Sequence, residues 1–333
     1  MSSQTANAVR TPFIYIRRDL PEIYIEEMKK LGAKVAVEPW EWNKEEPTPK
    51  IDLTNCDVLL TLGMRDDLSV LKYAPNVKWV HSFSVGIEAM IKSNFQNNSD
   101  IIVTNSKGCT AIPIAEHTLA MILAFSRGLQ TMINNKKDCS WETIPTIDLA
   151  LATVGIIGYG QIGLAIAERC KALGMRVIGC KRNPDKKLEE HDDADEIVGM
   201  GELDSVLAQS DFVVLSLPST KETKYLFDKE KLKKMKKGSY LINVGRGDAI
   251  IESDLVEVLN EGLLAGASLD VFEVEPLPVN HPFWTMDNVI VSPHNAYFSS
   301  QHMEHNMELF MTNLKNYMEG NSLINVVDKQ LGY

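Results

Sequence analysis

The chain has 333 residues, of which 44% are hydrophobic and 24% charged, so it is long enough for two globular domains. Its 45 acidic and 34 basic residues give a net charge of −11, which argues against nonspecific binding to nucleic acid or anionic membranes. No apolar run reaches membrane-spanning length and the N-terminus lacks the apolar core of a secretory signal, so we expect a cytoplasmic protein. The five cysteines are scattered without CxxC spacing, which indicates neither a disulfide framework nor a zinc site.

The first hundred residues alternate short apolar runs with helical patterns, which is typical of a parallel sheet covered by helices. We expect strands at residues 13–16, 35–37, 58–61, 77–82 and 101–104, and a helix at residues 20–31. The proline-rich and charged residues 38–50 indicate a surface loop, in which Trp40 and Trp42 are expected to act as anchors. A strongly apolar helix is expected from about residue 112 to 136, buried against another domain or a partner subunit, and a polar linker or arm at residues 134–146.

A second series of the same kind follows. Strands are expected at residues 153–157, 176–180, 212–215, 240–244, 265–269 and 289–291, and helices at 229–235, 253–261 and 301–320, with Ser253 as an N-cap. The predicted fold class is therefore α/β, with two doubly wound parallel-sheet domains of the Rossmann or flavodoxin type and a cleft between them.

The strand at residues 153–157 runs directly into a GxGxxG sequence and then into an amphipathic helix. In this context the glycines permit a tight turn, a close approach of backbone N–H groups to a pyrophosphate, and close packing of helix on strand. An ordinary glycine-rich turn is the weaker interpretation. We expect a dinucleotide to be bound by this turn, which consists of Gly158, Tyr159, Gly160, Gln161, Ile162 and Gly163.

The end of the second strand predicts which dinucleotide is used. Enzymes that use NAD usually carry an acid about 20 residues after the glycines, where it binds the ribose hydroxyls. Here Lys181 and Arg182 occupy this place, and two cations favour the 2′-phosphate of NADP. NADP is therefore the predicted cofactor, and solvation of both side chains is the alternative interpretation.

Ligands of doubly wound sheets bind beyond the carboxyl ends of the strands, and this rule selects three groups. Arg246, Glu275 and His294 each follow an expected strand and should meet at the edge that carries the glycine turn. Arginine can bind a carboxylate or polarise a carbonyl oxygen through two parallel N–H bonds. Histidine can donate the proton that accompanies hydride transfer, with the glutamate orienting its ring. Together they suggest hydride transfer to or from a small oxoacid, although each one alone would be an ordinary surface or strand-end residue.

Several longer motifs carry a resemblance to a known family. They are NSKG at residues 105–108, AEHTLA at 115–120, the glycine turn, NVGRG at 243–247, DVFEVEP at 270–276 and SPHNA at 292–296. In this order and over most of the chain they resemble the D-isomer-specific 2-hydroxyacid dehydrogenases. HPFW at residues 281–284 and the C-terminal residues 320–333 resemble a subgroup of glyoxylate, hydroxypyruvate and 2-ketoacid reductases.

This resemblance implies roles and boundaries that the residues alone do not give. Arg246 would bind and polarise the oxoacid, and His294, paired with Glu275, would be the general acid/base. The implied substrate contacts are Met64, Ser84, Val85, Gly86, Trp284 and Tyr297, with backbone N–H groups of residues 84–86 on the carboxylate. The implied cofactor contacts are Thr118, Pro218, Val244 and Asp270, the last with the nicotinamide carboxamide. Residues 1–108 and 297–333 would form the substrate domain and residues 109–296 the dinucleotide domain. The resemblance also implies that the protein is a homodimer.

Two alternative functions remain open from the sequence, and the substrate is not specified. An NAD-dependent dehydrogenase would share every motif except the two cations, and a dinucleotide-sensing interaction protein could be built on the same fold. The 2-oxoacid itself, whether glyoxylate, hydroxypyruvate, pyruvate or a bulkier one, is not specified. No metal site is expected, because no acid or cysteine completes the pair His302 and His305.

Overall fold

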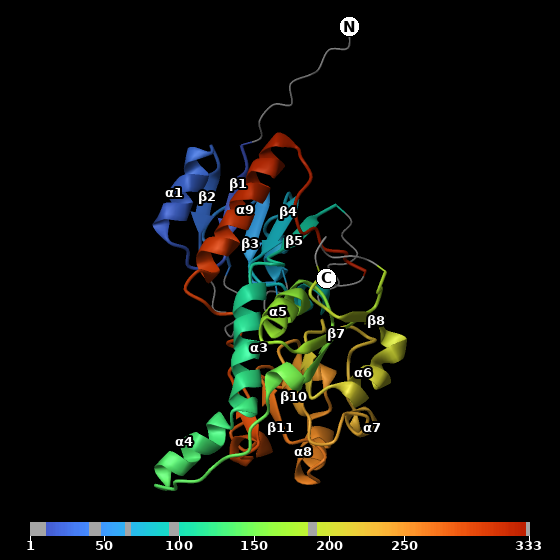
Figure 1. Cartoon of the computed structure of the whole chain (residues 1–333). Coiled ribbons are helices and arrows are strands. Elements are labelled where there is room, and N and C mark those ends of the chain that lie inside the picture. The colour runs from blue at the N-terminus through green and yellow to red at the C-terminus, as the bar shows by residue number, and fades with distance from the viewer. Residues whose placement is uncertain (1–10, 40–47, 64–67, 93–99, 186–191, 331–333) are drawn as a thin grey trace. The chain divides into compact units, whose positions relative to one another are not determined.

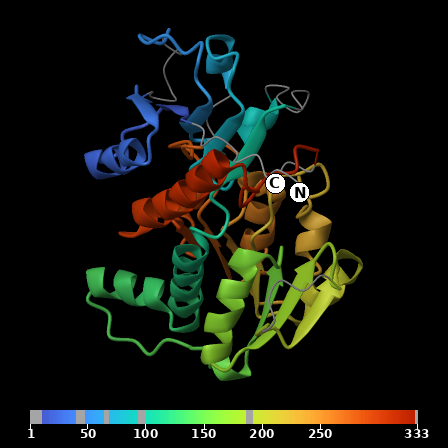
Figure 2. The ribbon, with the colours of Figure 1, turned by 90° about the horizontal axis from the view of Figure 1, so that it is seen from above.

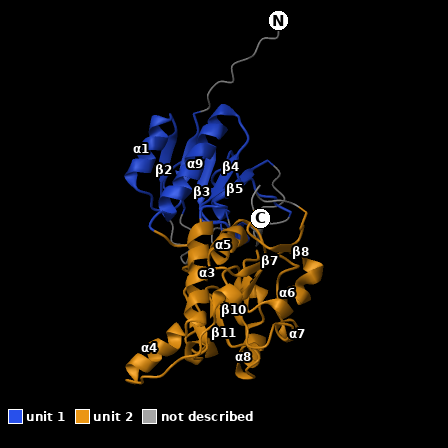
Figure 3. Cartoon of the chain, viewed as in Figure 1, with its two compact units in different colours: residues 1–109, 300–333 blue, residues 110–299 orange. Residues whose placement is uncertain are grey.

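The computed structural model describes residues 11–39, 48–63, 68–92, 100–185 and 192–330. Within it the chain forms two compact units (Figure 3), residues 1–109 with 300–333, and residues 110–299. The substrate and dinucleotide domains expected at residues 1–108 with 297–333 and at 109–296 stay a prediction. Trp40, Trp42 and Met64 lie outside the described residues. Among the described residues, no helix combines the length and apolar composition needed to cross a lipid bilayer.

The first unit is built on a parallel five-stranded sheet in the order β2-β1-β3-β4-β5 (Figure 1). Its strands carry apolar residues on both faces, as expected when helices cover both sides. The elements are β1 (Phe13–Ile16), α1 (Glu22–Lys30), β2 (Lys34–Val37), β3 (Val58–Thr61), β4 (Trp79–Ser82), α2 (Glu88–Lys92), β5 (Ile102–Asn105) and α9 (His302–Glu319).

The last helix, α9, completes the core of the first unit although it lies some two hundred residues away in sequence from β5. Phe310 of α9 stacks on Trp79 of β4 with ring centroids 5.3 Å apart, and Met307 and Leu314 are buried beside it. The helix ends at Gly320, whose φ of 75° is the left-handed conformation that glycine adopts at helix C-termini. The side of this helix that carries Met307, Phe310 and Leu314 therefore serves packing.

A histidine is buried in this core. His81 of β4 is 0% exposed, its Nδ1 lies 2.7 Å from Thr104 Oγ1, and the rings of Trp79, Phe83 and Phe310 surround it. Its Nε2 has no hydrogen-bond partner among the described residues. Burial lowers the pKa of His81 to about 3, because the charged ring would lose its hydration there.

This burial predicts a loss of stability in mild acid. The unfolded chain takes up a proton at His81 near pH 6.5, whereas the folded chain resists protonation until about pH 3. The folded state is therefore fully stable with respect to this group above pH 6.5, and it loses unfolding free energy as the pH falls below that value. Between pH 7.5 and 5.0 the wild type should therefore lose about 2 kcal/mol more unfolding free energy than His81→Gln. Urea denaturation at the two pH values measures this difference, and equal losses would contradict it.

The second unit contains a parallel seven-stranded sheet in the order β12-β11-β10-β9-β6-β7-β8. The strand order reverses between β6 and β9, which is the topological switch point of a doubly wound sheet. Its strands are β6 (Thr153–Ile157), β7 (Arg176–Lys181), β8 (Glu196–Gly199), β9 (Phe212–Leu215), β10 (Tyr240–Asn243), β11 (Gly266–Leu269) and β12 (Val289–Val291). The expected fold class of two parallel-sheet α/β domains is confirmed.

Helices cover both faces of this sheet. On one face α3 (Ala111–Ser126) and α5 (Gln161–Ala172) pack against β6 and β9, where they bury Ile122 and Ile166. On the other face α6 (Leu203–Gln209), α7 (Lys229–Leu232) and α8 (Glu252–Asn260) bury a second cluster that includes Leu207 and Leu255. The carboxyl ends of the strands are thereby left for the loops that carry the predicted site.

The structure corrects three details of the sequence prediction. The single helix expected at residues 112–136 is two helices, α3 and α4 (Leu129–Lys137), which Figure 2 shows as separate rods. Between them Gly128 has a φ of 65°, a conformation that ends one helix before the next begins. Ser253 lies inside α8, whose N-cap is Ile251, so it caps nothing. The elements α2, β8 and α6 were not predicted, because they are short or weakly periodic.

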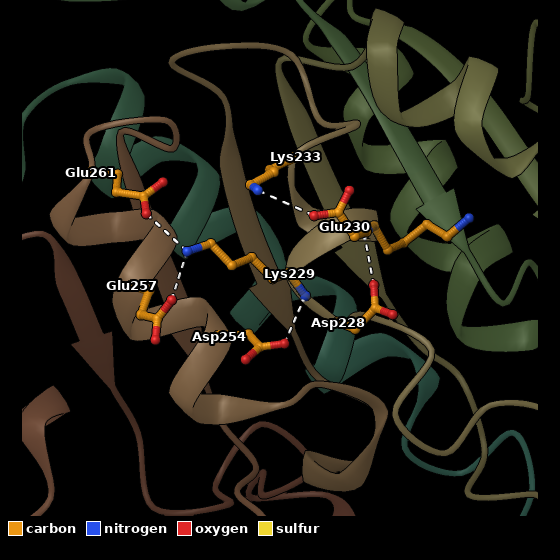
Figure 4. A network of polar contacts seen from close by, with 8 residues as sticks. Asp228, Lys229, Glu230, Lys233, Asp254, Glu257 and Glu261 are labelled. Carbon is orange, nitrogen blue, oxygen red and sulfur yellow. Dashed lines mark hydrogen bonds and ion pairs between the residues drawn. The ribbon is translucent and has the colours of Figure 1, made fainter.

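A polar network joins α7 to α8 (Figure 4). Lys229 Nζ lies 2.6 Å from Glu257 and 2.9 Å from Glu261, and its backbone N–H donates to Asp254 at 2.8 Å. The two carboxylates raise the pKa of Lys229 and Lys229 lowers that of Glu257. Because these side chains are exposed, the network adds little to stability and mainly fixes the outer surface of α8.

Candidate active site

The glycine turn begins where β6 ends. Gly158 has a φ of 96°, and a side chain there would come within 2.8 Å of the Ser216 backbone, so the position requires glycine. Gly160 is the N-cap of α5, and a Cβ there would have only Gly158 O within 4 Å, at 3.8 Å. This surface is therefore open to a ligand, and the first-turn N–H groups of α5 are suited to a pyrophosphate. These residues fit the predicted dinucleotide.

Tyr159 lies beneath this turn. Its ring is buried and its hydroxyl donates to Asp192, which joins the turn to the chain that leads into β8. The ammonium of Lys181, at the end of β7, lies 5.9 Å from the centroid of the Tyr159 ring, and Lys181 is almost fully buried. Arg182 follows as an exposed residue. The two predicted cations therefore differ, since only Arg182 extends into solvent beyond the strand.

His294 lies in a turn after β12 with a left-handed φ of 53°, which is uncommon for any residue other than glycine, asparagine or aspartate. Asp270, buried at the end of β11, holds this turn. Its backbone oxygen accepts from His294 N at 2.8 Å, and its carboxylate accepts from the backbone N–H groups of Asn295 and Ala296 at 2.8 and 3.0 Å. These bonds offset the backbone strain and fix the position of the His294 backbone from which the imidazole extends.

The imidazole of His294 contacts Glu275. Its Nδ1 lies 2.7 Å from Glu275 Oε2, while Glu275 Oε1 accepts from the Phe272 N–H at 3.2 Å. Both side chains are partly exposed, at 20% for His294 and 28% for Glu275. A carboxylate on Nδ1 orients the ring and fixes its tautomer, which leaves Nε2 as the atom that can exchange a proton with a substrate.

Arg246 follows β10 on a loop that approaches the Glu275 loop closely. Its Nη1 donates to Gly245 O at 2.8 Å, and Asn243 Nδ2 donates to Arg246 O at 2.9 Å. Gly247 packs so tightly that an added Cβ would come 2.0 Å from the Phe272 carbonyl carbon. All three predicted catalytic residues thus lie beyond the carboxyl ends of neighbouring strands, with Glu275 and His294 in direct contact.

The remaining predicted residues fall into two groups. In the second unit, Thr118 is buried on α3 with its hydroxyl donating to Ile114 O, and Val244 is buried after β10. Pro218 is partly exposed, Trp284 is exposed, and the Tyr297 ring stands edge-on to His294 with ring centroids 6.1 Å apart. In the first unit, Ser84 N donates to Ser82 Oγ at 3.1 Å, and Val85 O accepts from Asn105. The amide of Ser84 is therefore already used within its own loop, and that loop is held to β5.

Three supporting contacts in the structure are not predicted by the sequence. Ser292 donates to Asp270 Oδ1 at 2.6 Å, and His117 of α3 lies 3.3 Å from Ser292 Oγ. Burial lowers the pKa of His117, and the nearby Asp270 carboxylate counters that shift. Glu252 and His281 form a second histidine–carboxylate pair, with 3.2 Å between His281 Nε2 and Glu252 Oε2. No pattern joins such partners in the sequence, because each pair brings together segments from different elements.

Comparison with known proteins gives a consistent picture. Residues 119–296 match the family model described as D-isomer specific 2-hydroxyacid dehydrogenase, NAD binding domain. The glyoxylate reductase of Thermofilum pendens is 32% identical over 96% of this chain and 95% of its own. A D-isomer specific 2-hydroxyacid dehydrogenase from Xanthobacter autotrophicus Py2, solved with NADPH and MES, is 28% identical with a TM-score of 0.84, over 97% of this chain and 100% of its own.

A second solved structure agrees with these matches. The NADPH-dependent glyoxylate/hydroxypyruvate reductase of Sinorhizobium meliloti, in complex with NADP and sulfate, is 27% identical with a TM-score of 0.82. The alignment covers 97% of this chain and 100% of that one. With the dinucleotide turn and the histidine–glutamate pair in place, the chain belongs to the D-isomer specific 2-hydroxyacid dehydrogenase family and is an NAD(P)-dependent dehydrogenase of that family.

Proposed function

We propose that this protein is an NADPH-preferring reductase that converts a small 2-oxoacid to the D-2-hydroxyacid. The observation that carries the proposal is the 2.7 Å contact between His294 Nδ1 and Glu275 Oε2, on a turn fixed by Asp270. It is supported by the glyoxylate reductases among the relatives and by the NADPH-bound and NADP-bound structures of similar chains.

The reaction follows from these side chains. A dinucleotide held at the glycine turn would supply the hydride for the carbonyl carbon of the oxoacid. As the carbonyl oxygen gains negative charge, His294 donates its Nε2 proton to that oxygen, and Glu275 stabilises the ring through Nδ1. Arg246 binds the substrate and polarises its carbonyl through the guanidinium N–H groups. The products are a neutral hydroxyl group and a neutral imidazole, which takes up a proton from water before the next turnover.

A spectrophotometric screen of 2-oxoacids with NADPH tests this function. We expect NADPH consumption with glyoxylate, hydroxypyruvate or pyruvate, and a D-configured product wherever the product is chiral. Nucleotide binding without turnover across a panel that also includes branched and aromatic oxoacids would instead support a dinucleotide sensor. A clear preference for NADH over NADPH in catalytic efficiency would overturn the cofactor assignment and leave an NAD-dependent dehydrogenase.

Arg182 is the residue on which we expect NADPH selectivity to depend. It follows β7 at the place where the 2′-phosphate of NADP is predicted to lie. Nearby, the hydrogen bond from Thr220 lowers the pKa of Glu222, and the positive charge of Arg182 adds a smaller lowering. Arg182→Ala should raise the KM for NADPH by about 10- to 100-fold, because the 2′-phosphate would lose one or two charge-assisted hydrogen bonds. The KM for NADH should change little.

The control for this variant is Arg176→Ala at the other end of the same strand. Arg176 pairs with Glu196 at 3.0 Å and with Gln209 at 3.1 Å, far along β7 from the cofactor end. Arg176→Ala should leave the ratio of the KM for NADPH to the KM for NADH unchanged. Equal KM changes for NADPH and NADH in Arg182→Ala would contradict a role in phosphate recognition.

We also propose that the protein is a homodimer formed through α3 and α4. Large apolar side chains on these two helices are exposed, namely Ile112, Leu123, Leu129, Met132 and Ile133. Exposed apolar side chains that gather on consecutive helices are typical of a protein–protein interface. Sedimentation velocity distinguishes a dimer from a 37.2 kDa monomer, and a monomer at micromolar concentration would exclude the proposal.

A further inference from the structure

Glu275 lies on a loop that is held on both sides by one carboxylate. Glu252, the first residue of α8, accepts the backbone N–H of Glu273 through Oε1 at 2.8 Å. Through Oε2 it contacts His281 Nε2 at 3.2 Å. Glu273 precedes Glu275 by two residues and His281 follows it by six, so both ends of the segment with the catalytic carboxylate are joined to α8.

The tautomer of His281 can be assigned from its second nitrogen. Nδ1 accepts the backbone N–H of Phe283 at 3.4 Å at the start of the 3-10 helix Pro282–Thr285. An accepting Nδ1 carries no proton, so Nε2 carries it and donates to Glu252. The ring also packs on Phe283, with centroids 4.5 Å apart, and Phe283 is buried. His281 therefore connects a buried aromatic anchor to the carboxylate on α8.

We propose that Glu252 and His281 are a positioning pair for the reaction, which sets where Glu275 meets His294. This inference rests on the proposed roles of Glu275 and His294. A misplacement of about 1 Å at a catalytic group can cost about 100-fold in rate. Both members are largely buried, with side chains 12% and 18% exposed, so their contact is shielded from water and holds one geometry.

The surroundings of the pair are acidic. Burial raises the pKa of Glu273, the neighbouring carboxylates of Glu252 and Asp248 raise it further, and Lys224 opposes that rise. Ser219 donates to Asp248 Oδ2 at 2.7 Å, and Tyr225 N donates to Asp248 O at 2.7 Å. His281 thus supplies a donor to one of three neighbouring carboxylates. Its removal leaves Glu252 with a single hydrogen bond, from Glu273 N, among the described residues.

The test compares two substitutions at one position. His281→Leu keeps an apolar contact with Phe283 but cannot donate, whereas His281→Gln can place an N–H near the former Nε2. We expect kcat to fall by about 10- to 100-fold in His281→Leu, with the dissociation constant for NADPH unchanged, and to recover in His281→Gln. The solvent deuterium isotope effect on kcat should rise in His281→Leu, because proton transfer from a misplaced His294 becomes slower.

Two further variants separate the possible outcomes. Glu257→Gln changes an outward carboxylate of the same helix, which pairs with Lys229 (Figure 4), and should leave kcat unchanged. If kcat falls in His281→Leu but the isotope effect is unchanged, the variant only has a smaller folded fraction, and the proposal is wrong. A wild-type kcat in His281→Leu would overturn the proposal as well. His294→Asn in the same assay tests the function itself, since turnover in that variant would refute the acid/base role independently of His281.

Discussion

His294→Asn is expected to lower kcat for 2-oxoacid reduction by about 10²- to 10⁴-fold, the usual contribution of a positioned general acid. Asparagine cannot deliver a proton at neutral pH, so the alkoxide that forms during hydride transfer would have to take its proton from water. The dissociation constant for NADPH should stay close to that of the wild type, because no contact joins the His294 side chain to the glycine turn among the described residues.

Asparagine is chosen because it preserves the rest of the site. The backbone of His294 has a φ of 53°, and asparagine tolerates this left-handed conformation better than most residues. Its side-chain N–H can also stand near the place of Nδ1, where it can still donate to Glu275. A loss of activity in this variant would therefore report lost proton transfer and not a collapsed turn.

The matched control is His305→Asn on α9, in a unit that carries none of the three predicted catalytic residues. It should keep the wild-type kcat. Thermal unfolding of both variants shows whether either one is partly unfolded. If a fully folded His294→Asn retains kcat within a factor of about ten of the wild type, another group supplies the proton and the assignment is wrong.

Much of the fold could be predicted because parallel strands buried on both faces have a distinct sequence pattern. Runs such as FIYI at Phe13–Ile16 and FVVL at Phe212–Leu215 contain only apolar residues, and both are strands within the expected bounds. Once strands are placed, the rule that ligands lie beyond their carboxyl ends selects residues for chemistry without further information. That rule chose Glu275 and His294, which the structure brings into contact.

The features that were missed depend on contacts between distant segments. The break between α3 and α4 occurs at Gly128, and a side chain there would come within 2.6 Å of Ile144, a residue outside either helix. Periodicity continues across the break, so the sequence predicted one helix. Likewise the role of Glu252 is set by a backbone N–H 21 residues later in the chain, a relation that no local pattern encodes.

Gly247→Ala is expected to be among the most damaging single substitutions in the second unit. An added Cβ would lie 2.0 Å from the carbonyl carbon, 2.1 Å from the carbonyl oxygen and 2.5 Å from the Cα of Phe272. These are backbone atoms, which cannot rotate away as a flexible side chain could, so the Arg246 loop or the Glu275 loop must move. The destabilisation should be about 3 kcal/mol or more, at the upper end of what overpacking costs.

The same substitution should damage catalysis in whatever fraction stays folded. Because Arg246 and Glu275 lie on the two loops forced apart, kcat/KM should fall by about 100-fold for displacements near 1 Å. The control is Gly201→Ala in the 3-10 helix Met200–Glu202, where a Cβ would have nothing within 4 Å among the described atoms. Urea denaturation and kcat/KM corrected for active sites measure both effects. A wild-type unfolding free energy in Gly247→Ala would show that the two loops are not packed against each other at this point.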